Sequence, residues 1–166
     1  MGLDMFLIRR KKNVKDFDNW YRDGDEIMYW RKVNSIHRWF VENVQKGVDD
    51  CGYYKVEKEQ LESLHDICGE ILDRVIMAPS KITNGYSIEK KEDGSFEKIY
   101  NYIDGMIATN PEVCEELLPT QEGFFFGSTE YNNWYMEDVK RTYYELGILL
   151  KLYDFNNYDI YYSSSW

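Results

Sequence analysis

The residues around Asp93-Gly94 constrain the fold of this chain more than any other local pattern. Large side chains occupy every second position on both sides of this dipeptide, over residues 86–102. Alternation is the pattern of a β-strand, and Asp-Gly favours the tight turn that joins two antiparallel strands. The sequence therefore predicts a β-hairpin. Its alternating residues are Tyr86, Ile88, Lys90, Phe96, Lys98 and Tyr100.

Apolar residues at helical spacing occur in three longer segments. They predict helices over residues 29–45 and 59–75, and a further helix of about 20 residues that Ser128 or Thr129 caps. Asn110-Pro111 predicts the start of a short helix, with Asn110 as the cap and Pro111 at the first helical position.

Short apolar runs predict the strands of a sheet. We expect strands over residues 3–8, 53–56, 124–126 and 159–163, and a polar loop over residues 11–25. This mixture fits an α+β fold, in which about three main helices pack on a small antiparallel or mixed sheet and the hairpin projects. Neither a repeat nor a linker divides the sequence, so residues 1–166 are expected to form one globular domain.

Composition limits the class of protein. Hydrophobic residues make up 43% of the chain and charged residues 30%, a balance typical of a globular protein. The formal net charge of −10 repels polyphosphate, so we expect no binding of long nucleic acids. The sequence contains neither a run of roughly 20 apolar residues nor a recognisable signal peptide. With three widely spaced cysteines, which we expect to be reduced, these features predict a cytoplasmic protein that does not bind membranes.

The charge is unevenly distributed along the chain. Residues 1–40 contain nine Lys or Arg against six Asp or Glu, a net charge of +3. Residues 41–166 contain eleven against twenty-four, a net charge of −13. A small anion could therefore find a positive site near the amino end, although the molecule as a whole is acidic.

Short motifs lie along nearly the whole chain: GLDM at residues 2–5, YWRK at 29–32, VDDCG at 48–52, LLPT at 117–120 and YYSSSW at 161–166. Together they resemble a family of small uncharacterised proteins encoded by tailed phages and prophages. The resemblance omits residues 80–105, which would then be a variable hairpin insertion. No activity is established for the family. The resemblance therefore implies only a setting, the cytoplasm of an infected host cell, where a role in evading host defence is expected.

The predicted first helix carries the most informative set of polar and aromatic side chains. Trp30, Asn34 and His37 would share one face beside the apolar stripe, and Arg31 and Arg38 would lie further round. An aromatic ring, an amide, an imidazole and two guanidinium groups could hold a small anionic or nucleotide-derived ligand. The alternative is an ordinary amphipathic helix with polar residues at its boundary, and the sequence favours that alternative.

Ser128 and Thr129 follow a glycine at a predicted strand-to-helix junction. Free backbone amides at a helix N-terminus attract anions, so both residues are candidates for the wall of the same ligand site. The stretch lacks the lysine and the spacing of a Walker motif. A simple capping turn is the favoured alternative.

Three further side chains suggest chemistry. Asp4 stands inside an apolar strand and needs a partner, for which Arg31, Lys32 and His37 are candidates. Cys51 and His37 could form a nucleophile pair, but their spacing matches no protease signature. Three cysteines and two histidines form no recognised zinc ligand set, so we expect neither a metal nor another cofactor.

Three functional hypotheses remain open from the sequence. The leading one is a non-enzymatic accessory protein that binds a small anionic host ligand or a host protein. The second is an acidic inhibitor that presents the carboxylates of residues 41–166 to a basic host surface. The third is a small hydrolase or transferase that uses Cys51 and His37. The sequence favours a non-enzymatic role and leaves the oligomeric state open.

Overall fold

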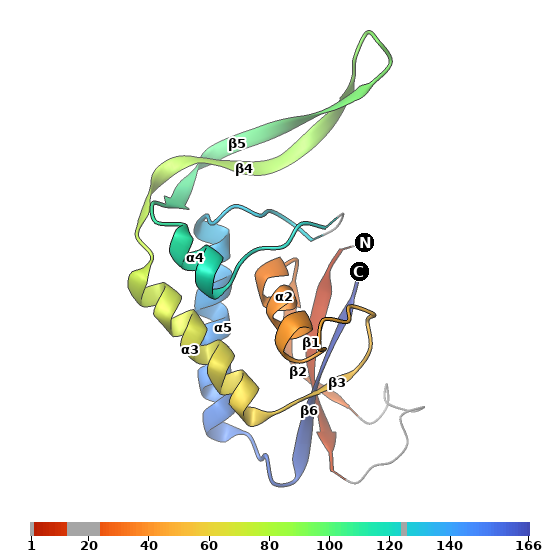
Figure 1. Cartoon of the computed structure of the whole chain (residues 1–166), viewed down its shortest axis with the longest axis vertical. Helices are drawn as coiled ribbons and strands as arrows, with labels where there is room; N and C mark the ends of the chain where they lie inside the picture. Colours follow the sequence, from red (N-terminus) through yellow and green to blue (C-terminus); the bar gives the residue numbers. More distant parts are fainter. Residues whose placement is uncertain (1, 13–23, 124–125) are drawn as a thin grey trace.

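The computed structural model of the chain describes residues 2–12, 24–123 and 126–166. A body made of helices and a four-stranded sheet carries a long two-stranded arm that projects from one end (Figure 1). The α+β class and the projecting hairpin expected from the sequence are confirmed. Most of the predicted loop over residues 11–25 lies outside the described residues.

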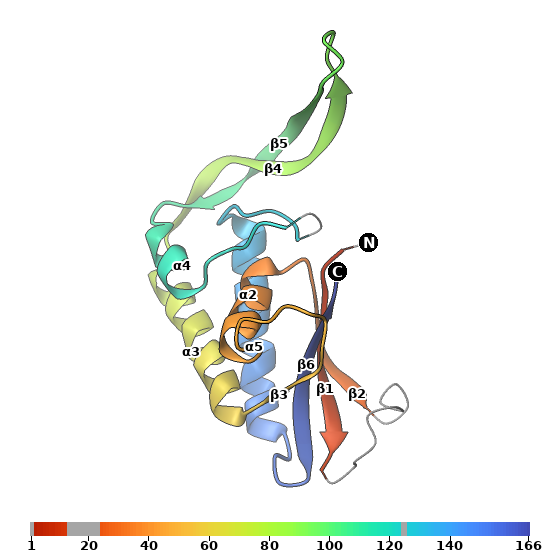
Figure 2. The ribbon, with the colours of Figure 1, turned by 45° about the vertical axis from the view of Figure 1, so that its right-hand side comes forward.

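The sheet of the body is antiparallel, with the strand order β2-β1-β6-β3. β1 (Asp4–Lys11) pairs with β2 (Asp25–Arg31) on one side and with β6 (Tyr158–Ser165) on the other, and the short β3 (Tyr54–Val56) pairs with the far edge of β6. Pairing of the first and last strands brings the two ends of the chain together (Figures 1 and 2).

The helices pack on one side of this sheet (Figure 2). They are α2 (Asn34–Asn43), α3 (Lys58–Arg74), the short α4 (Glu112–Leu117) and α5 (Asn133–Leu152). Aromatic rings join the layers: Phe40 of α2 stacks on Tyr162 of β6, with ring centroids 4.0 Å apart. Within the described residues, no helix is long and apolar enough to span a membrane.

The start of the predicted first helix is wrong. Tyr29, Trp30 and Arg31 belong to β2, where Trp30 pairs with Met5 and Arg31 with Asp4. Lys32 then adopts a positive φ of 59°, and α2 begins at Asn34. The apolar spacing was compatible with a helix, but pairing with β1 and burial of the aromatic residues decide for a strand.

Two predicted helix caps are also wrong. Asn132 caps α5, because its Oδ1 accepts hydrogen bonds from the amides of Trp134 (3.0 Å) and Tyr135 (3.2 Å), so Ser128 and Thr129 have no capping role. Asn110 does not cap α4. Its side chain bonds to the Ile76 amide at 2.8 Å and to the Arg74 carbonyl at 2.9 Å, which ties the start of α4 to the end of α3.

Of the predicted strand over residues 124–126, only the last residue is described, and it is not part of the sheet. Phe126 lies in a bend, and Phe124 and Phe125 lie outside the described residues. The elements predicted over residues 53–56, 59–75 and 159–163 are confirmed within two residues at each end. The predicted long helix of about 20 residues is confirmed as α5, but it begins three or four residues later than its predicted cap implied.

The arm consists of β4 (Met77–Lys90) and β5 (Phe96–Ala108). The predicted hairpin is confirmed, with Tyr86 opposite Tyr100, and its strands continue towards the body on both sides. A bulge interrupts the pairing between Thr83 and Tyr86. Gly85 sits in this bulge with a φ of +79°, a conformation that glycine adopts at little cost.

Candidate functional site

Trp30 lies in the core of the body and offers no surface to a ligand. Its side chain is fully buried, its Nε1 donates a 2.9 Å hydrogen bond to Thr142 Oγ1 of α5, and its ring packs 5.9 Å from that of Phe40. A buried indole needs such a hydrogen-bond acceptor. Trp30 therefore has a structural role: it links strand β2 of the sheet to α5.

Asn34 joins the start of α2 to the loop before α5. Its Nδ2 donates to the carbonyl oxygens of Phe126 (3.0 Å) and Ser128 (2.8 Å), and its Oδ1 accepts from the Gln121 amide (3.0 Å). The structure thus brings Asn34 and Ser128 together, as the ligand hypothesis requires. However, both ends of the buried amide are used by the backbone of the loop.

His37 is fully buried and uses both ring nitrogens within the protein. Nδ1 lies 2.8 Å from the hydroxyl of Tyr162, and Nε2 lies 3.0 Å from Oδ2 of Asp49. The other oxygen of Asp49 accepts a 3.1 Å bond from the indole of Trp166. The pKa of Tyr162 is raised far above its usual range, because the hydroxyl is buried and because Asp49 is negative.

This Asp49–His37–Tyr162 chain connects the surface to the core. Only Asp49 is partly accessible, with 23% of its side chain exposed. The Asp49 carboxylate can only accept a hydrogen bond, so Nε2 of His37 is the donor on that side, and Nδ1 faces the Tyr162 hydroxyl. The arrangement joins α2, β6 and the loop after α2, which is a structural role.

Cys51 and His37 do not form the nucleophile pair considered from the sequence, because both imidazole nitrogens of His37 already bond to other residues. Cys51 is a half-buried free thiol, and its carbonyl accepts a 3.4 Å bond from Ser163 Oγ. Cys68 and Cys114 are also free and buried, and burial raises the pKa of the Cys68 thiol to about 12. A thiol that does not ionise is a poor nucleophile.

The remaining predicted site residues lie at the surface and are held by local contacts. Arg38 donates to Glu42 Oε1 at 2.8 Å and to the Thr120 carbonyl at 3.4 Å. Ser128 Oγ accepts from the Glu130 amide at 3.1 Å, and the Thr129 carbonyl accepts from Thr120 Oγ1 at 3.1 Å. Ligand binding by these exposed groups stays a prediction.

Arg31 confirms the expectation for Asp4. Its Nε lies 3.9 Å from Oδ1 of Asp4, and the hydroxyl of Tyr29 donates to the same oxygen. The carboxylate therefore has partners on the adjacent strand β2, and 28% of its side chain remains exposed.

Among the described residues, the arm carries a group of exposed aromatic side chains. Tyr86 and Tyr100 contact each other across the two strands with ring centroids 6.0 Å apart, and Lys98 Nζ lies 4.6 Å from the centre of the Tyr86 ring. These contacts identify one face of the distal hairpin. We call it the aromatic face; its residues are Tyr86, Ile88, Lys90, Phe96, Lys98, Tyr100 and Tyr102.

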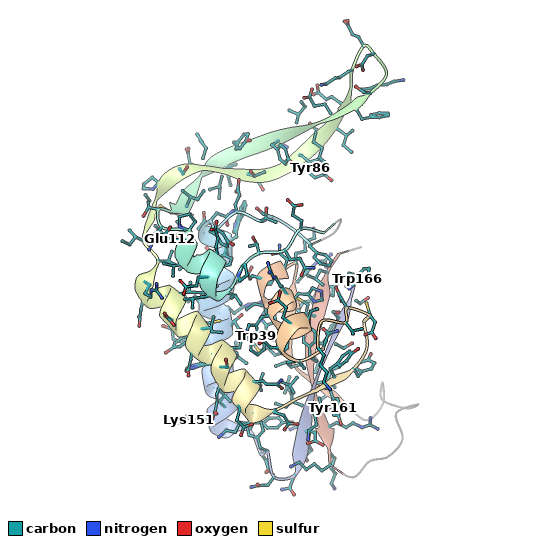
Figure 3. The ribbon with its side chains drawn as sticks, in the orientation of Figure 1. Trp39, Tyr86, Glu112, Lys151, Tyr161 and Trp166 are labelled. Carbon is teal, nitrogen blue, oxygen red and sulfur yellow. The ribbon has the colours of Figure 1, made fainter. Side chains whose placement is uncertain are left out.

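The aromatic face is bare. Its five large hydrophobic side chains are between 46% (Tyr86) and 71% (Phe96) exposed. Tyr86 lies on the projecting part of the arm, beyond the helices and the sheet (Figure 3). The sequence predicted the hairpin but gave no sign that its side chains would have no core to pack against, because alternation alone does not say what covers each face.

A second apolar surface lies on the body, between β2 and the C-terminal half of α5. Ile27, Met28, Ile148, Leu149 and Leu152 line this pocket, with Glu145 and Tyr153. Ile148 and Leu152 are 61% and 76% exposed. The pocket is open to solvent, and its lining holds no cluster of polar groups that could orient a small ligand.

Among the described residues, no group of three or more His, Cys, Asp and Glu side chains could hold a metal ion. Comparisons of the chain with protein-family models, with curated proteins and with solved structures found no match. The phage family suggested by the motifs therefore stays an expectation, and function has to be inferred from the geometry.

Proposed function

We propose that this chain is a non-catalytic binding protein that recognises another protein through its arm. The observation that carries the proposal is the bare aromatic face at the end of a hairpin that extends beyond the body. A two-stranded hairpin alone is marginally stable in water, and exposed tyrosine and phenylalanine side chains are the usual anchors of protein interfaces. A partner that covered this face would stabilise the arm.

Charge also favours the arm over the body as the binding element. Residues 77–108 contain four lysines and five acidic residues, a net charge of −1, so the rest of the chain carries −9. Fourteen residues of strand reach about 45 Å, whereas salt screens charges beyond about 8–10 Å. The end of the arm therefore meets a partner outside the repulsive field of the acidic body.

Affinity capture with matched variants tests the proposal. Tyr100→Ser combined with Tyr102→Ser removes two rings from the aromatic face, and Ile99→Ser on the opposite face is the control. We expect wild type and the control to retain a common partner that the double variant loses. Binding should weaken little between low and physiological salt, since apolar contacts carry it.

One outcome of this experiment would contradict the proposal. A partner held undiminished by the double variant, and released by salt, would point to the acidic body and to the inhibitor hypothesis instead. A small anionic ligand at Arg31, Arg38, Ser128 and Thr129 is a weaker proposal, because the aromatic and imidazole groups it needed are in the core. Titration calorimetry with nucleotides on wild type and Arg38→Ala tests it.

The setting implied by the motif resemblance adds a biological test of the same surface. If the protein acts against a host defence, phage plating on a defended host should improve when wild type is expressed. The double aromatic variant should lose this benefit and the Ile99→Ser control should keep it.

A further inference from the structure

We infer that the arm pairs face to face, in antiparallel orientation, with the arm of a second copy of this chain. The inference rests on the protein-binding role proposed for the arm and names its partner. The contact is formed by the aromatic face together with Asp104 and Met106, which lie on the same side of β5 nearer the body, because every second residue of a strand points to the same face.

This face is complementary to itself. A two-fold axis opposite Asn101 places Tyr100 against Tyr102 of the second copy, Lys98 against its Asp104, and Phe96 against its Met106. Each contact occurs twice, since a two-fold axis makes residue i meet j and j meet i. Ring meets ring, cation meets carboxylate, and apolar side chain meets apolar side chain.

The charges at the two ends of the face favour this orientation. Lys90 and Lys98 lie towards the tip, whereas Asp104 lies towards the base with 91% of its side chain exposed, beside Lys81. The antiparallel arrangement also brings Lys90 to the base of the other arm. There α4 exposes three glutamates, of which Glu112 is marked in Figure 3; the others are Glu115 and Glu116. A parallel arrangement would set lysine against lysine.

The area of contact is sufficient for a dimer. Large aromatic side chains bury about 150–250 Å² when fully covered. The five large side chains of the aromatic face are about half to two-thirds exposed, so covering them removes about 500–700 Å² on each copy. Two copies together bury about 1,000–1,400 Å², which reaches the size of specific interfaces.

The length of the arm keeps the two acidic bodies apart, so that their electrostatic repulsion does not oppose pairing. In the antiparallel arrangement the two bodies, each with a net charge of −9, lie at opposite ends of the paired arms. Their separation is several times the screening length at physiological salt, about 8 Å. Pairing through the body would instead bring like charges into contact.

Sedimentation velocity on the full chain tests the inference. At about 100 μM we expect wild type to sediment at twice the chain mass of 20.0 kDa. Tyr100→Asp on the aromatic face should sediment as a monomer, and Ile99→Asp on the opposite face should remain dimeric. Circular dichroism shows that each variant keeps its fold, which excludes unfolding as the cause of a change in mass.

Charge reversal tests the register. Lys98→Asp alone and Asp104→Lys alone should each weaken the dimer by about tenfold or more. The two substitutions in one chain restore the pair with the sign reversed, so the double variant should return to within about threefold of wild type. Additive loss in the double variant would overturn the antiparallel register.

Failure of this inference and failure of the proposed function give different results. A wild-type chain that is monomeric at this concentration overturns the second copy as partner; the proposed function stands if the Tyr100→Ser, Tyr102→Ser variant still loses its captured protein. A dimer that Tyr100→Asp leaves intact overturns the arm pairing as well, because another surface, such as the pocket beside α5, then joins the copies.

Discussion

At the scale of single residues, the polar side chains of this protein serve the fold before they serve a ligand. Asn34, His37 and Trp30 were the core of the site expected from sequence, and each is buried with its polar atoms bonded to protein groups. A buried polar group left without a partner costs about 1–3 kcal/mol. Because replacing either partner of such a bond would destabilise the fold, these residues are needed for stability even without a role in binding.

Removing the Tyr162 hydroxyl should show this cost directly. Tyr162→Phe keeps the ring that stacks on Phe40 but leaves Nδ1 of the buried His37 without its partner. We expect the free energy of unfolding to fall by about 1–3 kcal/mol in urea denaturation. Tyr158→Phe, at the start of the same strand, is the control and should change it by less than about 0.5 kcal/mol. Equal losses in both variants would contradict a special role for the His37 chain.

Asp138 should make stability depend on pH. Burial raises its pKa to about 6, although the nearby Arg141 opposes the shift. A carboxyl with a raised pKa binds its proton more tightly in the folded state, so its contribution to stability is present below about pH 4 and is lost as the pH rises through 6.

We therefore expect Asp138→Asn to be more stable than wild type at pH 8, and this advantage to shrink towards pH 4. Because 35% of the side chain is exposed, solvent screening limits the gain to about 1 kcal/mol or less. Urea denaturation at both pH values measures it, with Glu145→Gln as the control. A gain that is the same at pH 4 and pH 8 would exclude titration of Asp138 as its cause.

At the scale of elements, several hydrogen bonds attach the base of the arm to the body, among them one from the Ala108 amide to the Tyr131 carbonyl at 2.9 Å. Glu130 accepts hydrogen bonds from the backbone amide of Thr83 (3.0 Å) and from its hydroxyl, and the Asn133 side chain accepts from the Met106 amide at 3.1 Å. Ile82 is buried between them and packs over Gly105, where a side chain would collide with it. The base is thus fixed, while the part beyond the bulge is held by contacts between its own two strands.

Glu130→Ala should loosen the base of the arm without unfolding the body. We expect hydrogen exchange of the Thr83 amide to accelerate by about tenfold or more, because Glu130 no longer accepts the two charge-assisted bonds from Thr83, each of about 1.5–3 kcal/mol. Peptides from α3 and β6 should exchange at the wild-type rate. Glu122→Ala, an exposed carboxylate in the preceding loop, is the control and should leave the arm unchanged. Unaltered exchange at Thr83 in Glu130→Ala would show that these bonds do not hold the arm.

At the scale of the whole molecule, the core and the arm are separable. The core contains residues of the sheet and of all four helices but none from β4 or β5. The arm contributes exposed surface and little burial beyond its base. Because the arm adds little to the core, its exposed side chains are not constrained by folding and can serve binding.

Replacing residues 84–101 by Asn-Gly should therefore leave the body intact. The new turn joins Thr83 to its partner Tyr102 and retains the fixed base. We expect the free energy of unfolding to change by less than about 1 kcal/mol, with a single transition in thermal denaturation. A chain that no longer folds would mean that the arm is part of the folding unit.

The sequence by itself determined most of the segments that become helices and strands, because helical spacing, alternation and the Asp-Gly turn are local patterns. It predicted α3, α5, β6 and the hairpin, and it named Arg31 as one of three candidate partners for Asp4. Local patterns carry this information because each residue's backbone preference depends mainly on its neighbours in the chain.

Only the tertiary structure decided which faces are covered. Residues 29–31 fit a helix by spacing, but their pairing with β1 made them a strand and buried Trp30. Packing of α2 against β6 buried His37, so the two side chains share no site. The same long-range packing left Tyr86, Tyr100 and Tyr102 uncovered on the arm. Burial is the sum of contacts between segments far apart in the chain, so spacing along the sequence cannot specify it.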